Sequence, residues 1–506
     1  MNIHLPSVRG YVRQVRRHGR RAAFTLVEML VTMAVSIILV FALAQAYAVF
    51  GTILAEGRAA IELAGSMRSV AHQLQRDLDN VTVPVRPWTD EGGAQGYFEY
   101  IDGPATDKYP VLPSLVDASI DFSRFGDTDD ILAFTTQDVI TPFVGVVGGD
   151  RRQSSHAEVI WWCQESIDGF GFDIYRRVLL IRPDLGVLDT GTFLNRPIGY
   201  TNLRNAIQAF AAENDISFRV SWRLTSDYAG NDNVDLRTGD INNDQYHVQV
   251  QFIANSLADL TRRENRFLHR HPFPNWTNAD EKPAPYPFPM DSDMLLELGR
   301  LRPQDRQLTE ALAFDVQAFD PQARIYRSAD GDALVPSDPG YVVAAWGAPL
   351  GTAAPSPAPI PLGFGAFVDL GYGNPLRYPA DPEELRTTVN TLNMRTWSLF
   401  SRNPAPHSAL NQFTYCTWST HYERDDRRQR RRANNLYYYQ DPDPAADVNP
   451  EDKHDFATTG FYYGVERETS PPYPHPLRGI QVRLRAWDPD SRQVRQATVV
   501  SNFIPE

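Results

Sequence analysis

The sequence predicts an α+β protein in which one long N-terminal helix precedes a mainly antiparallel β head with a large, loop-rich β insertion. Three observations predict this class. An apolar segment runs from Phe24 to Phe50, an amphipathic pattern continues it to about Asn80, and short segments of alternating polarity separated by turn residues follow. The first segment has the length of a membrane-spanning helix, the second has the period of a helix and the third has the period of strands.

A basic leader precedes the apolar segment. Its arginines, with no acidic residue among them, are Arg9, Arg13, Arg16, Arg17, Arg20 and Arg21. Because positively charged flanks stay in the cytoplasm, we expect the chain after the apolar segment to be exported. The apolar segment exceeds the roughly 20 residues that span a bilayer. It is also too long for a secretory signal, and although 46–48 superficially resembles a small-x-small cleavage site, the helical pattern runs on past it.

An amphipathic stretch continues the same helix. Its apolar residues recur in steps of three or four: Ala60, Ala64, Met67, Ala71, Leu74, Leu78 and Val81. No proline occurs between Phe24 and Val83, while Pro84 and Pro87 lie just beyond. This pattern predicts one helix that is half membrane-embedded and half exposed, ending near Asn80.

Glu28 stands near the start of the apolar segment, where a carboxylate costs roughly 2.5–3.5 kcal/mol if it is buried near the membrane centre. Residues 23–28 read Ala-Phe-Thr-Leu-Val-Glu. With the basic leader, this sequence resembles the N-terminus of type IV pilin-like proteins. The resemblance implies that prepilin peptidase cuts between Ala23 and Phe24 and that the new amine of Phe24 is methylated. The family usually has Gly before the cut, whereas this chain has Ala23.

The resemblance also gives Glu28 a role. In the family this carboxylate meets the N-terminal amine of a neighbouring subunit, and an ion pair in lipid recovers much of the desolvation cost. Thr25 and Glu28 are therefore expected to act in assembly. The packing surface for other helices is expected along the stripe Ala64, Met67, Ala71 and Leu74. The alternative is a plain anchor whose glutamate reaches the lipid headgroups.

The exported part reads as short strands. They are predicted at 130–135, 157–163, 172–181, 215–223, 246–253, 312–319, 478–487 and 493–500. Turns at 168–171 and 488–491 predict two hairpins, and 314–321 resembles 480–489 in its aromatic-Asp-Pro ending.

Two of these segments carry a second resemblance. Glu158-Val159-Ile160-Trp161, followed by Tyr175-Arg176-Arg177, is similar to paired strands of the J-type minor pseudopilins of type II secretion systems, and 477–482 resembles that family's closing strands. The resemblance divides the chain into a leader (1–23), a helix (24–83) and a head (84–506), with 185–475 as an insertion. That insertion contains proline-rich stretches at 272–289 and 353–361.

Charge, length and cysteine content limit the classes of function and the domain organisation that the chain can have. The net charge of −13 argues against nucleic-acid binding, and the run of charges at 423–432 is either a solvated loop or a docking patch for an acidic partner. More than 400 residues follow the helix, enough for one large or two domains. Cys163 and Cys416 could form a disulfide in an oxidising compartment or remain two buried thiols.

Motifs for catalysis are missing from the sequence: it has no phosphate loop, nucleophile elbow or His-Glu-x-x-His pattern. His269 and His271 lack a third metal ligand nearby. Asp240, Asn242 and Asp244 begin like a calcium loop, but Gln245 replaces the turn glycine. We therefore expect no cofactor, with calcium at 240–244 as a weak alternative.

These patterns together favour a non-catalytic minor pseudopilin in the inner membrane, with its N-terminus cytoplasmic and its head periplasmic. The resemblance implies four partners: prepilin peptidase, major pseudopilins, other minor pseudopilins and the inner-membrane assembly platform. A position at the tip of the pseudopilus suits a bulky head. The alternatives are a minor pilin of a type IV pilus and, less favoured, a membrane-anchored envelope enzyme.

Overall fold

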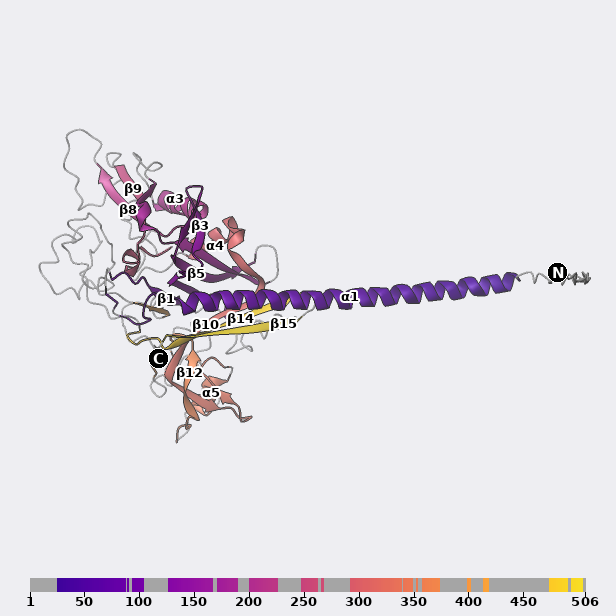
Figure 1. The fold of residues 1–506 in the computed structure, drawn as a ribbon. Coiled ribbons are helices and arrows are strands. Elements are labelled where there is room, and N and C mark those ends of the chain that lie inside the picture. Colours follow the sequence, from indigo (N-terminus) through magenta and orange to yellow (C-terminus); the bar gives the residue numbers. More distant parts are fainter. Residues whose placement is uncertain are drawn as a thin grey trace, which may run out of the picture. The chain divides into compact units, whose positions relative to one another are not determined.

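The computed structural model describes residues 25–87, 89–90, 93–103, 126–166, 171–189, 200–225, 247–262, 265–267, 292–338, 340–348, 352–353, 357–373, 398–401, 413–417, 473–489 and 493–503. The chain divides into two compact units, Met1–Ala60 and Ile61–Glu506, so the boundary falls inside helix α1. The elements confirm the α+β class, with one long apolar helix and a mainly antiparallel β head (Figure 1).

The helices and strands, in chain order, are α1 (Leu26–Asp79), β1 (Phe98–Ile101), β2 (Ile131–Gln137), β3 (Phe143–Val147), β4 (Asp150–Ser154), β5 (His156–Glu165), β6 (Phe172–Leu180), η3 (Pro183–Leu185), β7 (Val187–Asp189), α3 (Tyr200–Glu213), β8 (Phe218–Thr225), β9 (His247–Ala254), η4 (Asp259–Thr261), α4 (Ser292–Leu301), η6 (Pro303–Asp305), β10 (Arg306–Arg327), β11 (Ala333–Leu334), α5 (Tyr341–Trp346), β12 (Gly363–Val368), β13 (Thr414–Cys416), β14 (Gly479–Asp488) and β15 (Gln493–Asn502).

The main sheet of the head has the strand order β13-β1-β2-β5-β6-β10-β14-β15, with β11 and β12 also paired to β10. Both predicted hairpins are present as antiparallel pairs: Trp161 lies opposite Arg176 in β5–β6, and Leu484 lies opposite Ala497 in β14–β15. The two segments with similar sequences, in β10 and β14, pair with each other.

Strand β10 joins the two halves of this sheet. It pairs with β6 at its start, with β14 in its middle and with β12 near its end. The sequence predicted a strand only at 312–319, inside an insertion. The range 185–475 therefore supplies a central strand of the main sheet as well as peripheral structure. Pro321 lies where the β10–β12 register shifts, a position that tolerates a residue without a backbone donor.

Each face of the main sheet carries its own apolar core. On one face, the last turns of α1 insert Met67, Val70, Leu74 and Leu78 among strand residues such as Trp161. On the other face, Trp162 and its neighbours pack against α3, α4 and the small β7-β9-β8 sheet. The sheet is thus covered on both sides, which explains why β2 and β5 are apolar on both faces.

Replacing Leu74 with alanine should lower the free energy of unfolding of the head by about 2–5 kcal/mol, because the fully buried side chain would leave a cavity between α1 and the sheet. Urea unfolding followed by tryptophan fluorescence measures this loss. His72→Ala, on the exposed side of the same helix, is the matched control and should change stability by less than about 0.5 kcal/mol.

Candidate functional site

The first turn of α1 is closed by a capping box between Thr25 and Glu28. The Thr25 hydroxyl accepts a hydrogen bond from the Glu28 amide at 3.2 Å, and Glu28 Oε2 accepts from the Thr25 amide and hydroxyl, each at 3.0 Å. This reciprocal arrangement satisfies donors that a helix start leaves open. In the single chain, the Glu28 carboxylate therefore serves its own helix, a role that the sequence analysis did not assign to it.

Helix α1 is long and apolar enough to cross a membrane, by length and composition. No charged residue occurs from Met29 to Ala55, a stretch of about 40 Å at 1.5 Å per residue, against roughly 30 Å of bilayer hydrocarbon. The apolar stretch is therefore longer than a single perpendicular crossing needs, and several of its residues lie outside the hydrocarbon unless the helix tilts strongly.

An apolar stripe of α1 is exposed in the chain. Tyr47, Phe50, Leu54 and Ile61 are spaced by three, four and seven residues, and each is at least 63% exposed. The helical period places them on one face of α1. Ile61 is the first residue of the head unit, and the head leaves its side chain exposed.

The prediction that Met67 and Leu74 pack against helices of other subunits is wrong. Met67 and Leu74 are buried against the chain's own sheet, and Ala71 is partly buried against the same core. Ala64 precedes this region and is half-buried. The head uses this stripe for its own core, so a neighbouring helix cannot use it as well.

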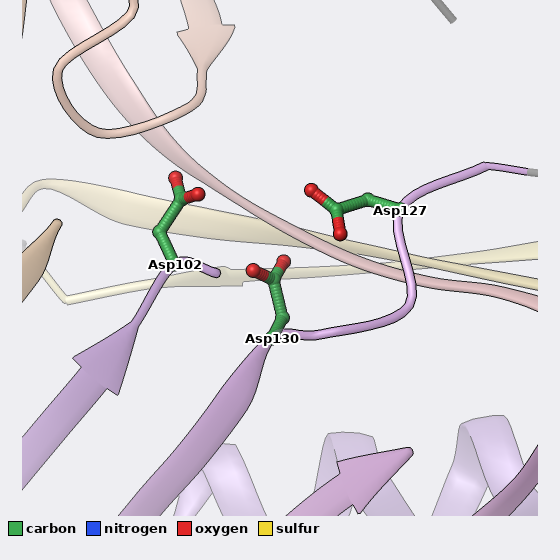
Figure 2. A group of neighbouring side chains, drawn as sticks. All are labelled: Asp102, Asp127 and Asp130. Atoms are coloured by element: carbon green, nitrogen blue, oxygen red, sulfur yellow. The ribbon is translucent and has the colours of Figure 1, made fainter. Parts of the chain in front are cut away.

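A group of three buried carboxylates lies where β1 and β2 begin or end beside β10. Asp102 follows β1, whereas Asp127 and Asp130 precede β2 (Figure 2). One oxygen of each lies within 4.8 Å of the others. The sequence analysis read Asp127 as part of a plain turn; its proximity to Asp102 depends on how β1 and β2 pair.

The carboxylates fill a gap in the sheet. On the edge of β10 opposite β14, neither β6 nor β12 pairs with residues 312–317. There the Val316 amide donates to Asp130 Oδ2 at 2.6 Å, and the Tyr100 hydroxyl donates to the Val316 carbonyl. At Val316, side chains thus take the hydrogen bonds that a neighbouring strand would otherwise supply. Nearer the start of the gap the partner is backbone: the Gly126 amide donates to the Leu312 carbonyl at 2.9 Å, and the Phe314 amide donates to the Asp127 carbonyl at 2.8 Å.

Backbone amides donate to each of the three carboxylates, and the amide at Asp127 Oδ1 is that of Asp129, at 3.3 Å. Asp130 Oδ1 accepts from the Gly103 amide at 3.1 Å. Asp102 Oδ2 accepts from the Leu370 amide. It also lies 2.7 Å from the Tyr100 hydroxyl, whose one proton it shares with the Val316 carbonyl. Carboxylate oxygens are also ligands that Ca²⁺ prefers, but these hydrogen bonds account for the buried acids without an ion, so we assign no ligand to the group.

The electrostatic consequence of this packing is clear. Burial raises the pKa of Asp130 well above its usual range, and the charges of Asp127 and Asp102 raise it further. Burial, followed by the charge of Asp369, raises the pKa of Asp315 to about 7, although Arg483 lies 3.6 Å from Asp315. Burial and nearby like charges disfavour ionisation, so Asp130 and Asp315 keep their protons to a higher pH than a solvent-exposed aspartate does.

Cys163 and Cys416 do not form a disulfide. Cys163 is in β5 and Cys416 in β13, three strand positions apart in the sheet, or about 14 Å at the usual strand spacing. A disulfide needs Cα atoms no more than about 7 Å apart. The alternative of two separate thiols is therefore the one that the structure has.

Alkylation of the denatured chain without reductant should therefore add two labels per molecule. Intact mass measures this, and the same sample treated with reductant first is the control. A chain that takes up the two labels only after reduction would contradict the assignment.

Several predicted residues lie outside the described ones. They are the cleavage and methylation site at Ala23 and Phe24, the weak calcium candidates Asp240, Asn242 and Asp244, the histidines His269 and His271, and the charge run at 423–432. Predictions about them remain predictions.

Comparison of the chain with protein-family models, with curated proteins and with solved structures gave no match.

Proposed function

We propose that the chain is a non-catalytic, pilin-like minor subunit of the J-type pseudopilin class, which assembles through α1 and helps drive protein export across the outer membrane. The observation that carries the proposal is α1 itself. One continuous helix, Leu26–Asp79, contains both a membrane-length apolar segment and the turns that are built into the core of the head.

The exposed stripe of α1 supports assembly with other helices. Tyr47, Phe50, Leu54 and Ile61 form an apolar face that continues past the end of the charge-free stretch from Met29 to Ala55, and the head leaves Ile61 exposed. A helix anchored in the same bilayer and rising beside it is the partner that would bury this face over its whole length. Major and other minor pseudopilins are such partners, placed by an inner-membrane assembly platform.

Glu28 would change partners in this process. In the single chain its carboxylate caps its own helix through Thr25. In the assembly, the N-terminal amine of a neighbouring subunit would replace these bonds with an ion pair, whose attraction is strengthened in a medium that excludes water. The proposal places the N-terminus at the cytoplasmic side of the inner membrane and the head in the periplasm.

Intact mass and N-terminal sequencing of the protein from native membranes, with and without prepilin peptidase, test the pathway. The proposal expects a mature chain that begins with N-methyl-Phe24 only when the peptidase is present. An intact leader, or cleavage near Ala48, would rule it out. Co-purification with other pseudopilins and loss of export on deletion separate secretion from the alternative of a type IV pilus, where deletion would affect surface pili.

Glu28→Leu should leave membrane insertion intact and reduce cross-linking to neighbouring subunits at least tenfold, because the ion pair that sets their register is lost. Site-specific photo-cross-linking from position 50 in native membranes measures this. Glu56→Leu, an exposed acid on the same helix, is the control and should cross-link like the parent. Equal cross-linking in both variants would remove Glu28 from the assembly mechanism.

A further inference from the structure

The contact between α1 and the sheet is repetitive on its apolar side. The helix residues that pack against the sheet recur in steps of three or four: Leu63, Met67, Val70, Leu74 and Leu78. A slip of the helix by one turn, about 5 Å, would put each of them near the place of the next one. Because apolar side chains of similar volume replace each other at little cost, this stripe by itself specifies the helix position weakly.

One buried polar residue interrupts the repetition. Asp77 is 3% exposed and lies on the side of α1 that faces the sheet. Arg176 holds its carboxylate with two bonds, from Nε to Oδ2 at 2.7 Å and from Nη2 to Oδ1 at 2.8 Å. Trp161 Nε1 donates to Oδ2 at 3.0 Å, and Gln73 of the same helix donates to Oδ1 at 3.0 Å.

The two sheet partners of Asp77 form a rigid platform. Trp161 and Arg176 lie directly opposite each other in β5 and β6, and the guanidinium lies 5.8 Å from the centre of the indole ring. After a one-turn slip, the carboxylate would be about 5 Å from these donors, leaving a buried carboxylate and a largely buried guanidinium apart. The polar contact therefore penalises positions that the apolar stripe tolerates.

We infer that Asp77 is a positioning residue, which fixes the axial and rotational register of α1 on the sheet and so determines which face of the helix stays uncovered. The register itself is a property of the single chain. The consequence for assembly rests on the proposed function, because the uncovered face, which begins at Ile61 in the head unit, is the one offered to neighbouring helices.

Backbone hydrogen bonds just after the C-terminus of α1 also hold this end of the helix on the sheet. The Gln137 amide donates to the Asn80 carbonyl at 3.0 Å, and the Thr82 amide donates to the Thr135 carbonyl at 3.0 Å. They tie the exit of the helix to β2 and are left unchanged by substitutions of the side chain at 77. The test therefore asks whether these bonds suffice without the Asp77 carboxylate.

Distance measurement between two spin labels gives the register directly. The labels go on Ser69→Cys, on the exposed side of α1, and Thr498→Cys, exposed on β15, in the full chain with Cys163→Ala and Cys416→Ala. The chain is studied in detergent micelles without other subunits. The variants are Asp77→Leu/Arg176→Leu, which replaces the ion pair with apolar groups, and Asp77→Asn, which keeps the size of the side chain.

The inference expects the distance distribution to shift by about 5 Å or to split into two populations in the double variant, and to broaden in Asp77→Asn. The control is Arg76→Ala, which removes only the exposed ion pair to Asp138 and should keep the parent's distance. If the double variant does not fold, Asp77→Asn decides.

A folded variant with the parent's single narrow distribution would overturn the inference, because a residue that contributes only stability leaves the distance unchanged. The result is also independent of the proposed function. A parent chain with a single narrow distribution that nevertheless fails to assemble in membranes would count against the proposed function alone, and a folded double variant with an unshifted register would count against this inference alone.

Discussion

Replacing Arg266 with methionine should lower the free energy of unfolding by about 3–5 kcal/mol, because it leaves the Glu99 carboxylate in the core without this cation. The side chains of Arg266 and Glu99 are both 0% exposed and are joined at 3.1 Å. The guanidinium also donates to the Leu260 carbonyl and lies 4.3 Å from the centre of the Tyr97 ring. Methionine fills much of the volume but supplies none of these donors.

Urea unfolding of the full chain in detergent micelles, followed by tryptophan fluorescence, measures this effect. Arg152→Met is the matched control, because Arg152 pairs with Asp150 at the surface and should lose no more than about 1 kcal/mol. Arg266→Met/Glu99→Gln should recover part of the loss, since the isolated charge is then gone. An Arg266→Met chain as stable as the control would show that the pair is not buried as described.

The second large effect is a loss of stability as the pH rises. Asp315 ionises with a pKa of about 7 in the folded head, mainly because of burial and the nearby Asp369 charge, against about 4 in the unfolded chain. Between these values the unfolded chain has released a proton that the folded chain keeps. The stabilisation is therefore complete below about pH 4 and is lost as the pH rises through about 7, by up to about 4 kcal/mol.

Asp315→Asn removes the ionisable group and with it this pH dependence. From pH 5 to pH 8 the free energy of unfolding of the parent should therefore fall relative to that of the variant. The groups that face Asp315 are Asp369 and Asp102, which raise its pKa, and Arg483 and Arg485, which lower it. Asp150→Asn, an exposed acid, is the control and should track the parent at every pH. Parallel curves for parent and Asp315→Asn would contradict the raised pKa.

The parts of the fold that local sequence determines could be predicted. Helix α1 follows from an uninterrupted period of three to four, and the β5–β6 and β14–β15 hairpins follow from alternation around a turn. Strand β10 was underestimated because Pro321 reads as a stop, whereas a register shift accommodates it. The helical period also does not distinguish packing of Met67 and Leu74 against a partner from packing against the chain's own sheet, because both arrangements bury the same residues.

The buried charges could not be predicted, because their partners are remote in sequence. Arg266 and Glu99 are 167 positions apart, and Asp77 and Arg176 are 99 positions apart. Asp102, Asp127 and Asp369 come together only once β1, β2 and β12 take their places beside β10. A turn-like setting beside glycine is all that the sequence shows for Asp127.

The three-partner strand β10 has a consequence for how the head folds. The start of β10 pairs with β6, which precedes it in the sequence. Its middle pairs with β14, which follows more than 150 residues later and pairs in turn with β15. Until β14 and β15 are available, one edge of β10 presents open backbone groups that invite wrong pairing. Such long-range closure is slow, so a head that lacks its last strands should be prone to aggregation.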